Sequence, residues 1–275
     1  MGVLDGKAAL VTGAGRGIGA AIARKLALNG ASVIVSELDL DPAEETVSVI
    51  AAAGGRAVSL IGDVAAPDFG ERALKTALDS FGDLDIIVNN AGFIWNTAIQ
   101  NTTDAQWQAM IDVHATAPFR VLRAAYSHFR AAAKREEQAG ITKYRKVVNV
   151  SSVSGLYGAP TQLAYSAAKA SLIGVTRTLA KEWGRLRVNV NCVAFGYIDT
   201  RLTQRYERAP ATIDIKGESY KVGLDGRMLD AYTPTIPLGR PGTPAEAAGA
   251  VYLFCIPESD YISGQVLVCD GGPRI

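Results

Sequence analysis

Tyr165 and Lys169 are four residues apart in the segment 162–183, where the apolar spacing predicts a helix. Side chains four positions apart project from the same helix face, so this spacing places an ammonium group beside a phenol. A nearby positive charge favours the phenolate and lowers the pKa of a tyrosine from about 10, which suits general acid and base catalysis. Ser152 follows the predicted strand 147–150, and its hydroxyl can hold a substrate oxygen. The three side chains predict proton transfer at a carbonyl or hydroxyl group.

A glycine-rich turn, TGAGRGIG over 12–19, follows the predicted strand 8–11 and leads directly into the predicted helix 19–29. Glycine permits positive φ and a close approach of the backbone to phosphate, while a helix N-terminus offers free N–H groups and partial positive charge. The turn therefore predicts a site for the diphosphate of a dinucleotide. A plain tight turn is the alternative interpretation.

Glu37 ends the next predicted strand, 20 residues after Gly17, where a carboxylate can accept hydrogen bonds from the adenosine ribose. A carboxylate repels a 2′-phosphate, so this position favours NAD. Arg16, inside the turn, could pair with a 2′-phosphate, lie on the adenine face or point into water. We therefore expect NAD as the cofactor, with NADP as the alternative.

Short apolar runs that alternate with helical segments must position these groups. The runs predict strands and the intervening segments predict helices: strands 8–11, 33–35, 57–61, 86–88, 147–150, 188–193 and 266–268; helices 19–29, 43–53, 67–81, 104–133, 162–183 and 244–254. The strands are almost entirely apolar, as strands covered on both faces are. The pattern predicts an α/β fold: a Rossmann-type, doubly wound, seven-stranded parallel sheet with helices on both faces, in a single domain over residues 1–275.

Composition excludes several classes of protein. The 28 Lys and Arg nearly balance the 27 Asp and Glu, and the basic residues are scattered, so we expect no nucleic-acid partner. No apolar run approaches the roughly 20 residues of a membrane span, and we expect a cytoplasmic protein with no membrane partner. Cys192, Cys255 and Cys269 have no CxxC spacing, so we expect small buried side chains rather than disulfides, and no bound metal.

Two segments depart from the short connections elsewhere. The charged segment 134–146 is expected to extend a helix and loop back as a solvated surface. The segment 201–243 is long, polar and rich in Gly and Pro, and it follows the carboxyl end of a strand, where open α/β sheets bind ligands. We expect a substrate lid here, with outer bounds 195–243.

The chain resembles the short-chain dehydrogenase/reductase family in its single-domain form, over essentially its whole length. The resemblance lies in a set of motifs: TGAGRGIG (12–19), Asp63-Val64, Asn89-Asn90-Ala91-Gly92, Ser152 in NVSSVSG, Tyr165-Ser-Ala-Ala-Lys169, Pro237-Leu-Gly-Arg240 and Asp270-Gly-Gly272. The core and tail are similar to those of 3-oxoacyl carrier-protein reductases.

The resemblance implies a cofactor-binding set: Gly13, Arg16, Gly17, Ile18, Gly19, Glu37, Asp63, Val64, Asn90, Ala91, Gly92, Tyr165, Lys169, Ile198 and Thr200. In such a set Asp63 and Val64 contact adenine, and residues 90–92 pass along the cofactor ribose. Ile198 and Thr200 contact the nicotinamide end, and Lys169 binds the nicotinamide ribose. The resemblance also implies a homotetramer formed through the two longest helical segments.

Two positions differ from the family pattern. His114 stands where most members carry an asparagine that helps hold a proton-relaying water. An imidazole can donate and accept hydrogen bonds, so His114 either serves the relay or merely fills the space. Phe195 stands in Ala194-Phe195-Gly196-Tyr197 where the family usually has Pro-Gly. Phe195 either changes the start of the lid or forms an aromatic wall, and Trp95 and Tyr157 are expected near the pocket mouth.

The expected activity is hydride transfer between a nicotinamide cofactor and a secondary alcohol or ketone, a small-molecule substrate. Ser152, Tyr165, Lys169 and His114 form the expected catalytic set. The alternative is a catalytically weak or inactive NAD(P)-binding sensor or partner protein. Retention of all three of Ser152, Tyr165 and Lys169 favours the enzyme.

Overall fold

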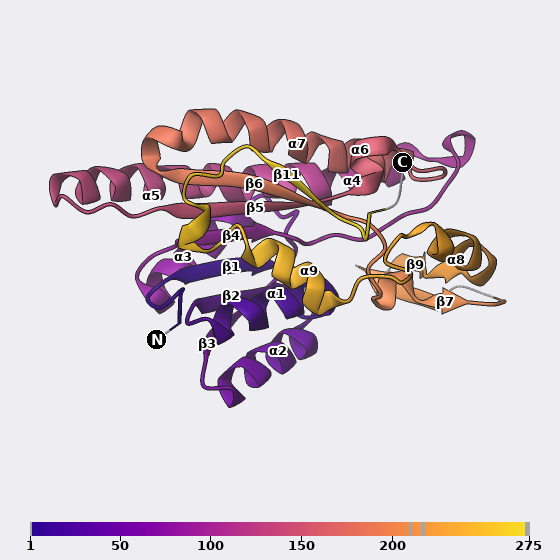
Figure 1. Cartoon of the computed structure of the whole chain (residues 1–275), viewed down its shortest axis with the longest axis horizontal. Coiled ribbons are helices and arrows are strands. Elements are labelled where there is room, and N and C mark those ends of the chain that lie inside the picture. The colour runs from indigo at the N-terminus through magenta and orange to yellow at the C-terminus, as the bar shows by residue number, and fades with distance from the viewer. Residues whose placement is uncertain (1, 209–210, 216–217, 273–275) are drawn as a thin grey trace.

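The computed structural model describes residues 2–208, 211–215 and 218–272, and a parallel sheet of seven strands forms its centre (Figure 1). The strands are β1 (Ala8–Thr12), β2 (Ser32–Glu37), β3 (Arg56–Ile61), β4 (Ile86–Asn89), β5 (Arg145–Ser152), β6 (Val188–Phe195) and β11 (Val266–Cys269). Their order in the sheet is β3-β2-β1-β4-β5-β6-β11, so the direction of winding reverses between β1 and β4. Ligands bind beyond the carboxyl ends of strands at such a reversal. The predicted doubly wound α/β sheet is confirmed.

Helices cover both faces of the sheet (Figure 1). Their apolar sides pack into two separate core clusters. One face carries α1 (Gly17–Leu28), α2 (Leu40–Ala52) and α9 (Pro244–Tyr252), and the other carries α3 (Phe69–Phe81), α5 (Ala117–Gln138) and α7 (Leu163–Trp183). Three shorter helices lie in the connections: α4 (Asp104–Ile111), α6 (Val153–Tyr157) and α8 (Gly226–Tyr232).

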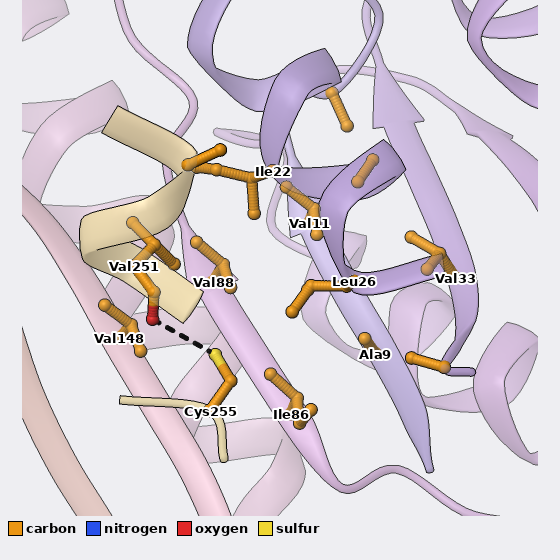
Figure 2. Close-up of a cluster of buried hydrophobic side chains, with 14 of the residues drawn as sticks. Ala9, Val11, Ile22, Leu26, Val33, Ile86, Val88, Val148, Val251 and Cys255 are labelled. Atoms are coloured by element: carbon orange, nitrogen blue, oxygen red, sulfur yellow. Dashed lines mark hydrogen bonds between the residues drawn. The ribbon is translucent and has the colours of Figure 1, made fainter. Parts of the chain in front are cut away.

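Successive residues of one strand enter different cores. Ala9 and Val11 of β1 belong to the cluster beneath α1 and α9, whereas Leu10 between them belongs to the opposite cluster. Figure 2 shows the first cluster, where Ala9 and Val11 meet Ile22 and Leu26 of α1. Burying a side chain of this size contributes roughly 1.5–3 kcal/mol. Burial on both faces explains why the strands lack polar alternation.

The predicted helix over 104–133 forms, but it is not a regular α-helix throughout. A π-helical turn, Asp112–Thr116, separates α4 from α5, and the Ala117 N–H donates to the Asp112 carbonyl five positions back. Pro118 supplies the reason, because it has no N–H to bond the carbonyl four residues earlier, and its ring crowds that carbonyl. The wide turn includes His114.

The charged segment 134–146 extends α5 to Gln138 and then loops back, as predicted, and residues 134, 135 and 137–142 are exposed. Its last two residues are the exception. Arg145 is fully buried at the start of β5 and forms two hydrogen bonds to the Glu136 carboxylate, at 3.0 and 2.7 Å. Lys146 is also buried and lies 2.6 Å from Asp260. These two basic side chains can be buried because each is paired with a carboxylate.

The connection after β6 is folded rather than irregular. It contains the parallel pair β7 (Arg205–Tyr206) and β10 (Leu224–Asp225), the hairpin β8 (Ala211–Ile215) and β9 (Glu218–Val222), and α8. Figure 1 shows this region in orange beyond the ends of β5 and β6. Residues 209–210 and 216–217 of the predicted lid lie outside the described residues.

Within the described ranges, no helix combines the length and apolar character needed to cross a membrane.

Candidate functional site

A cavity of about 1200 Å³ lies at the carboxyl ends of the central strands. Every residue predicted to bind the cofactor or to perform chemistry lines it. These residues come from the glycine turn, the ends of β2, β4 and β5, the segment after β3, the π-helical turn, α7 and the segment after β6. The fold thus brings together side chains that are as far apart in sequence as Gly13 and Thr200.

The glycine turn forms an open helix N-terminus. Gly17 begins α1 with φ +53°, and the preceding Arg16 provides no side-chain cap for the first N–H groups. Gly19 packs so tightly on the turn that a Cβ atom would lie 1.9 Å from the Gly13 carbonyl oxygen. The Asn90 amide fixes the same region by donating to Gly13 O at 3.2 Å. Uncapped N–H groups facing a cavity fit the diphosphate of a dinucleotide.

Two carboxylates lie at the end of the cavity next to β2. The Glu37 carboxylate accepts hydrogen bonds from the Gly15 N–H at 3.0 Å and the Leu38 N–H at 2.9 Å. Asp39 forms a 2.8 Å ion pair with Arg16. Pairing with a 2′-phosphate was one of the alternatives left open for Arg16. The guanidinium therefore already has an anionic partner, and Glu37 is held at the cavity edge.

Ser152, Tyr165 and Lys169 lie buried next to one another. Ser152 ends β5, and its hydroxyl donates to the Phe195 carbonyl at 3.4 Å. Tyr165 and Lys169 face the cavity from α7, and Lys169 Nζ lies 5.8 Å from the centre of the Tyr165 ring. The Lys169 ammonium donates to the Val150 carbonyl at 2.8 Å. The spacing in sequence thus correctly brings these two side chains to one helix face.

The expected lowering of the Tyr165 pKa is wrong for this arrangement. Burial raises the pKa of Tyr165 to about 12, an effect that a hydrogen bond with Ser152 only partly opposes. Burial also lowers the pKa of Lys169 to about 8. The phenol is therefore protonated at neutral pH, because burial raises its pKa more than the hydrogen bond with Ser152 lowers it.

His114 is 1% exposed and lies edge-on to Tyr165, with ring centres 5.1 Å apart. Its Nε2 lies 2.8 Å from the Phe93 carbonyl oxygen, and a carbonyl only accepts, so Nε2 carries the hydrogen. Nδ1 is then an acceptor, and it is buried with no hydrogen-bond partner. Burial and the charge of Lys169 lower the pKa of His114 well below 6.5, so the ring is neutral.

The expected pocket-mouth residues Trp95 and Tyr157 line the cavity. Sequence reasoning missed Ala109 on α4 and Leu229 and Tyr232 on α8, which line it too. No motif identifies these side chains, because their position depends on how two connections fold over the sheet. Across the described part of the chain, no three His, Cys, Asp or Glu side chains gather as a metal site requires.

Comparison with known proteins gives the family. Residues 13–273 match the family described as Enoyl-(Acyl carrier protein) reductase. The 3-oxoacyl-[acyl-carrier-protein] reductase of Synechocystis sp. is 36% identical, over 99% of this chain and 98% of its own. A dehydrogenase/reductase structure from Sinorhizobium meliloti is 32% identical with TM-score 0.82, covering 99% of this chain and 96% of that one.

A candidate 2-deoxy-d-gluconate 3-dehydrogenase from Agrobacterium tumefaciens, solved with bound NADP, is also 32% identical. Its TM-score is 0.79, covering 98% of this chain and 96% of that one. The family match and the similarity to these relatives extend over nearly the whole length of the chain. The chain belongs to the short-chain dehydrogenase/reductase family of NAD(P)-dependent oxidoreductases.

Proposed function

We propose that this protein interconverts a secondary alcohol and a ketone, with Ser152, Tyr165 and Lys169 as the catalytic side chains. The observation that carries the proposal is the meeting of these three buried groups in the cavity that also holds the open N-terminus of α1. A protein that only binds a dinucleotide has no use for a proton donor at the far end of the site.

The residues present fit a nicotinamide dinucleotide. The N–H groups at the start of α1 would hold its diphosphate, Glu37 its adenosine ribose, Asp63 and Val64 its adenine, and Ile198 and Thr200 its nicotinamide end. When bound, the nicotinamide supplies or accepts the hydride.

Proton transfer falls to Tyr165. At neutral pH its raised pKa keeps the phenol protonated, as a donor to the oxygen of a ketone must be. The Ser152 hydroxyl is placed to hold that oxygen by a hydrogen bond, and the Lys169 ammonium stabilises the phenolate that remains. In the oxidation direction the same groups act in reverse.

Replacing Tyr165 with phenylalanine tests the assignment. Tyr165→Phe removes only the hydroxyl, so we expect kcat to fall by about 100-fold or more. Cofactor Kd, measured by nucleotide fluorescence, should change less than threefold. Tyr157→Phe is the control, since Tyr157 lines the same cavity but is 54% exposed. Unimpaired turnover in Tyr165→Phe would refute the assignment, and cofactor binding without turnover of any ketone would favour a sensor.

We propose that NAD is preferred over NADP. Glu37 and Asp39 place two carboxylates at the adenosine end of the cavity, and the only guanidinium that the described cavity lining has there, Arg16, is paired with Asp39. The excess negative charge disfavours a 2′-phosphate. The NADP bound to the Agrobacterium tumefaciens relative belongs to that protein's site.

We also propose that 195–243 acts as a substrate lid and that the protein is a cytoplasmic homotetramer. Leu202, Leu229 and Tyr232 of the lid line the cavity, which supports the first point. Trp107 on α4 and Phe119 on α5 are exposed, which supports association through these helices.

A further inference from the structure

We propose that the substrate is an uncharged carbonyl compound or alcohol with a largely hydrocarbon body, recognised by shape and apolar contact. This inference rests on the hydride transfer proposed above and adds the class of molecule that receives it. The substrate half of the cavity carries the argument.

The wall beside Tyr165 is apolar. Tyr165 belongs to a small hydrophobic cluster with Phe93, Met110 and Ala164, which is separate from the two cores of the sheet. Four further side chains pack against this cluster: Ile94, Trp95, Ala109 and Val113. All four also line the cavity, so a substrate whose oxygen meets Tyr165 has hydrocarbon and an indole ring alongside its body.

The lid adds a second wall of similar character. Leu202, Leu229 and Tyr232 line the cavity from the lid, and Leu229 is 5% exposed. Phe195, at the end of β6, is also 5% exposed and lines the cavity. A hydrocarbon body between the two walls is removed from contact with water on both sides. Burial of its apolar surface favours binding.

Several polar side chains in this half are paired with one another. The Ser154 hydroxyl donates to Gln162 Oε1 at 2.9 Å, and the Gln162 amide donates to Asn96 Oδ1 at 3.0 Å. The Gln108 amide likewise donates to Asp112 Oδ1 at 2.9 Å. A polyol would lose its hydrogen bonds to water and find these partners already engaged, which disfavours its binding.

Asp112 brings one carboxylate to the substrate half, where it is bonded to Gln108, and more of the charged side chains lie in the other half. Arg16, Glu37 and Asp39 line the end of the cavity next to β2. Arg201 also lines the cavity and follows Thr200 in the chain. The Thr200 methyl group would lie 3.8 Å from a Cβ atom at Gly17, so the Arg201 side chain starts from backbone near the phosphate turn. Lys169 lies beside Tyr165, but its ammonium already donates to the Val150 carbonyl, and the side chains of the apolar wall carry no cation for a substrate carboxylate.

Two sets of substrates test the class. In a series of methyl ketones from 2-butanone to 2-octanone, we expect kcat/KM to rise about two- to fourfold for each added methylene. Ethyl 3-oxohexanoate should exceed the 3-oxohexanoate anion at least tenfold in kcat/KM. A cyclic ketone should likewise exceed a keto sugar of similar size.

A variant pair ties the preference to the wall. Trp95→Ala should flatten the rise along the ketone series while leaving the Kd of the dinucleotide within threefold of the parent. Tyr261→Ala, which truncates a fully exposed aromatic side chain outside the cavity lining, should keep the parent slope.

The experiments distinguish failure of the proposed reaction from failure of the proposed substrate class. If no ketone or alcohol turns over with either cofactor, the proposed reaction fails. If turnover occurs but the series is flat in the parent, or the carboxylate or the keto sugar is preferred, the reaction stands and the substrate class is overturned. An unchanged slope in Trp95→Ala would overturn the assigned wall.

Discussion

His114 is bonded to the cavity wall through one ring nitrogen. Its Nε2–H donates to Phe93 on the segment after β4, and its Nδ1 is a buried acceptor beside the glycine of residue 92. A neutral ring whose pKa is well below 6.5 gains no proton between pH 6 and 9. We therefore propose that His114 is a positioning residue that fixes the backbone beside the cofactor site, not a carrier of protons.

Two substitutions of His114 separate these roles. Glutamine can place an amide nitrogen where Nε2 lies, whereas asparagine is too short to reach Phe93. We expect His114→Gln to stay within about threefold of the parent in kcat/KM, and His114→Asn to lose roughly tenfold, in line with the value of one buried hydrogen bond. The pH–rate profile of His114→Gln should overlay that of the parent. Loss of one limb of the profile in that variant would show that the imidazole carries a proton.

The proposed preference for NAD also depends on a single pair of residues, Arg16 and Asp39. Asp39→Asn removes one carboxylate and frees the guanidinium, so we expect the ratio of kcat/KM for NADPH over NADH to rise about three- to tenfold, the size of a partly exposed ion pair. Asp41→Asn is the matched control, because Asp41 carries the same charge in the first turn of α2 but does not line the cavity. Equal ratios in the two variants would contradict the assignment.

At the scale of elements, the packing at the amino ends of the strands includes ion pairs that the sequence does not predict. Glu136, near the end of α5, binds the fully buried Arg145 of β5. Glu136→Ala leaves that guanidinium short of a partner, and we expect a loss of about 2–4 kcal/mol in the free energy of unfolding. Urea unfolding measures the change.

The neighbouring Glu137→Ala serves as the control for this prediction, since Glu137 is exposed and should change the stability by less than about 0.5 kcal/mol. The double variant Glu136→Ala with Arg145→Met should recover part of the loss, because it removes the buried charge as well. Equal stability of the two glutamate variants would show that the pair contributes nothing.

The same elements show what a sequence can predict. The strands were predictable because burial on both faces makes them largely apolar, despite buried polar residues such as Asn149 and Asn191. The site residues were predictable because their motifs are local. The π-helical turn at His114 required weighing Pro118 against a strong helical pattern, and the burial of Arg145 on β5 depends on a carboxylate from the preceding helix α5. The apolar wall from α8 follows from tertiary packing that no local pattern encodes.

At the scale of the whole molecule, the proposed assembly can be measured directly. Each chain has a mass of 29.0 kDa, and we expect light scattering to give a particle of four chains. Phe119→Glu places a charge on an exposed apolar position of α5 and should lower the measured mass. Glu137→Ala on the same helix should leave it unchanged, and a monomeric parent protein would refute the tetramer.

The folded lid has a consequence for how such a protein can diversify. Leu202, Leu229 and Tyr232 reach the cavity from a connection that contains none of the proposed proton-transfer groups. Substitutions confined to these three positions can therefore retune which molecules are accepted without altering the machinery that turns them over. A small library at these sites offers an economical route to new selectivity, and natural drift there would change preference long before it abolished activity.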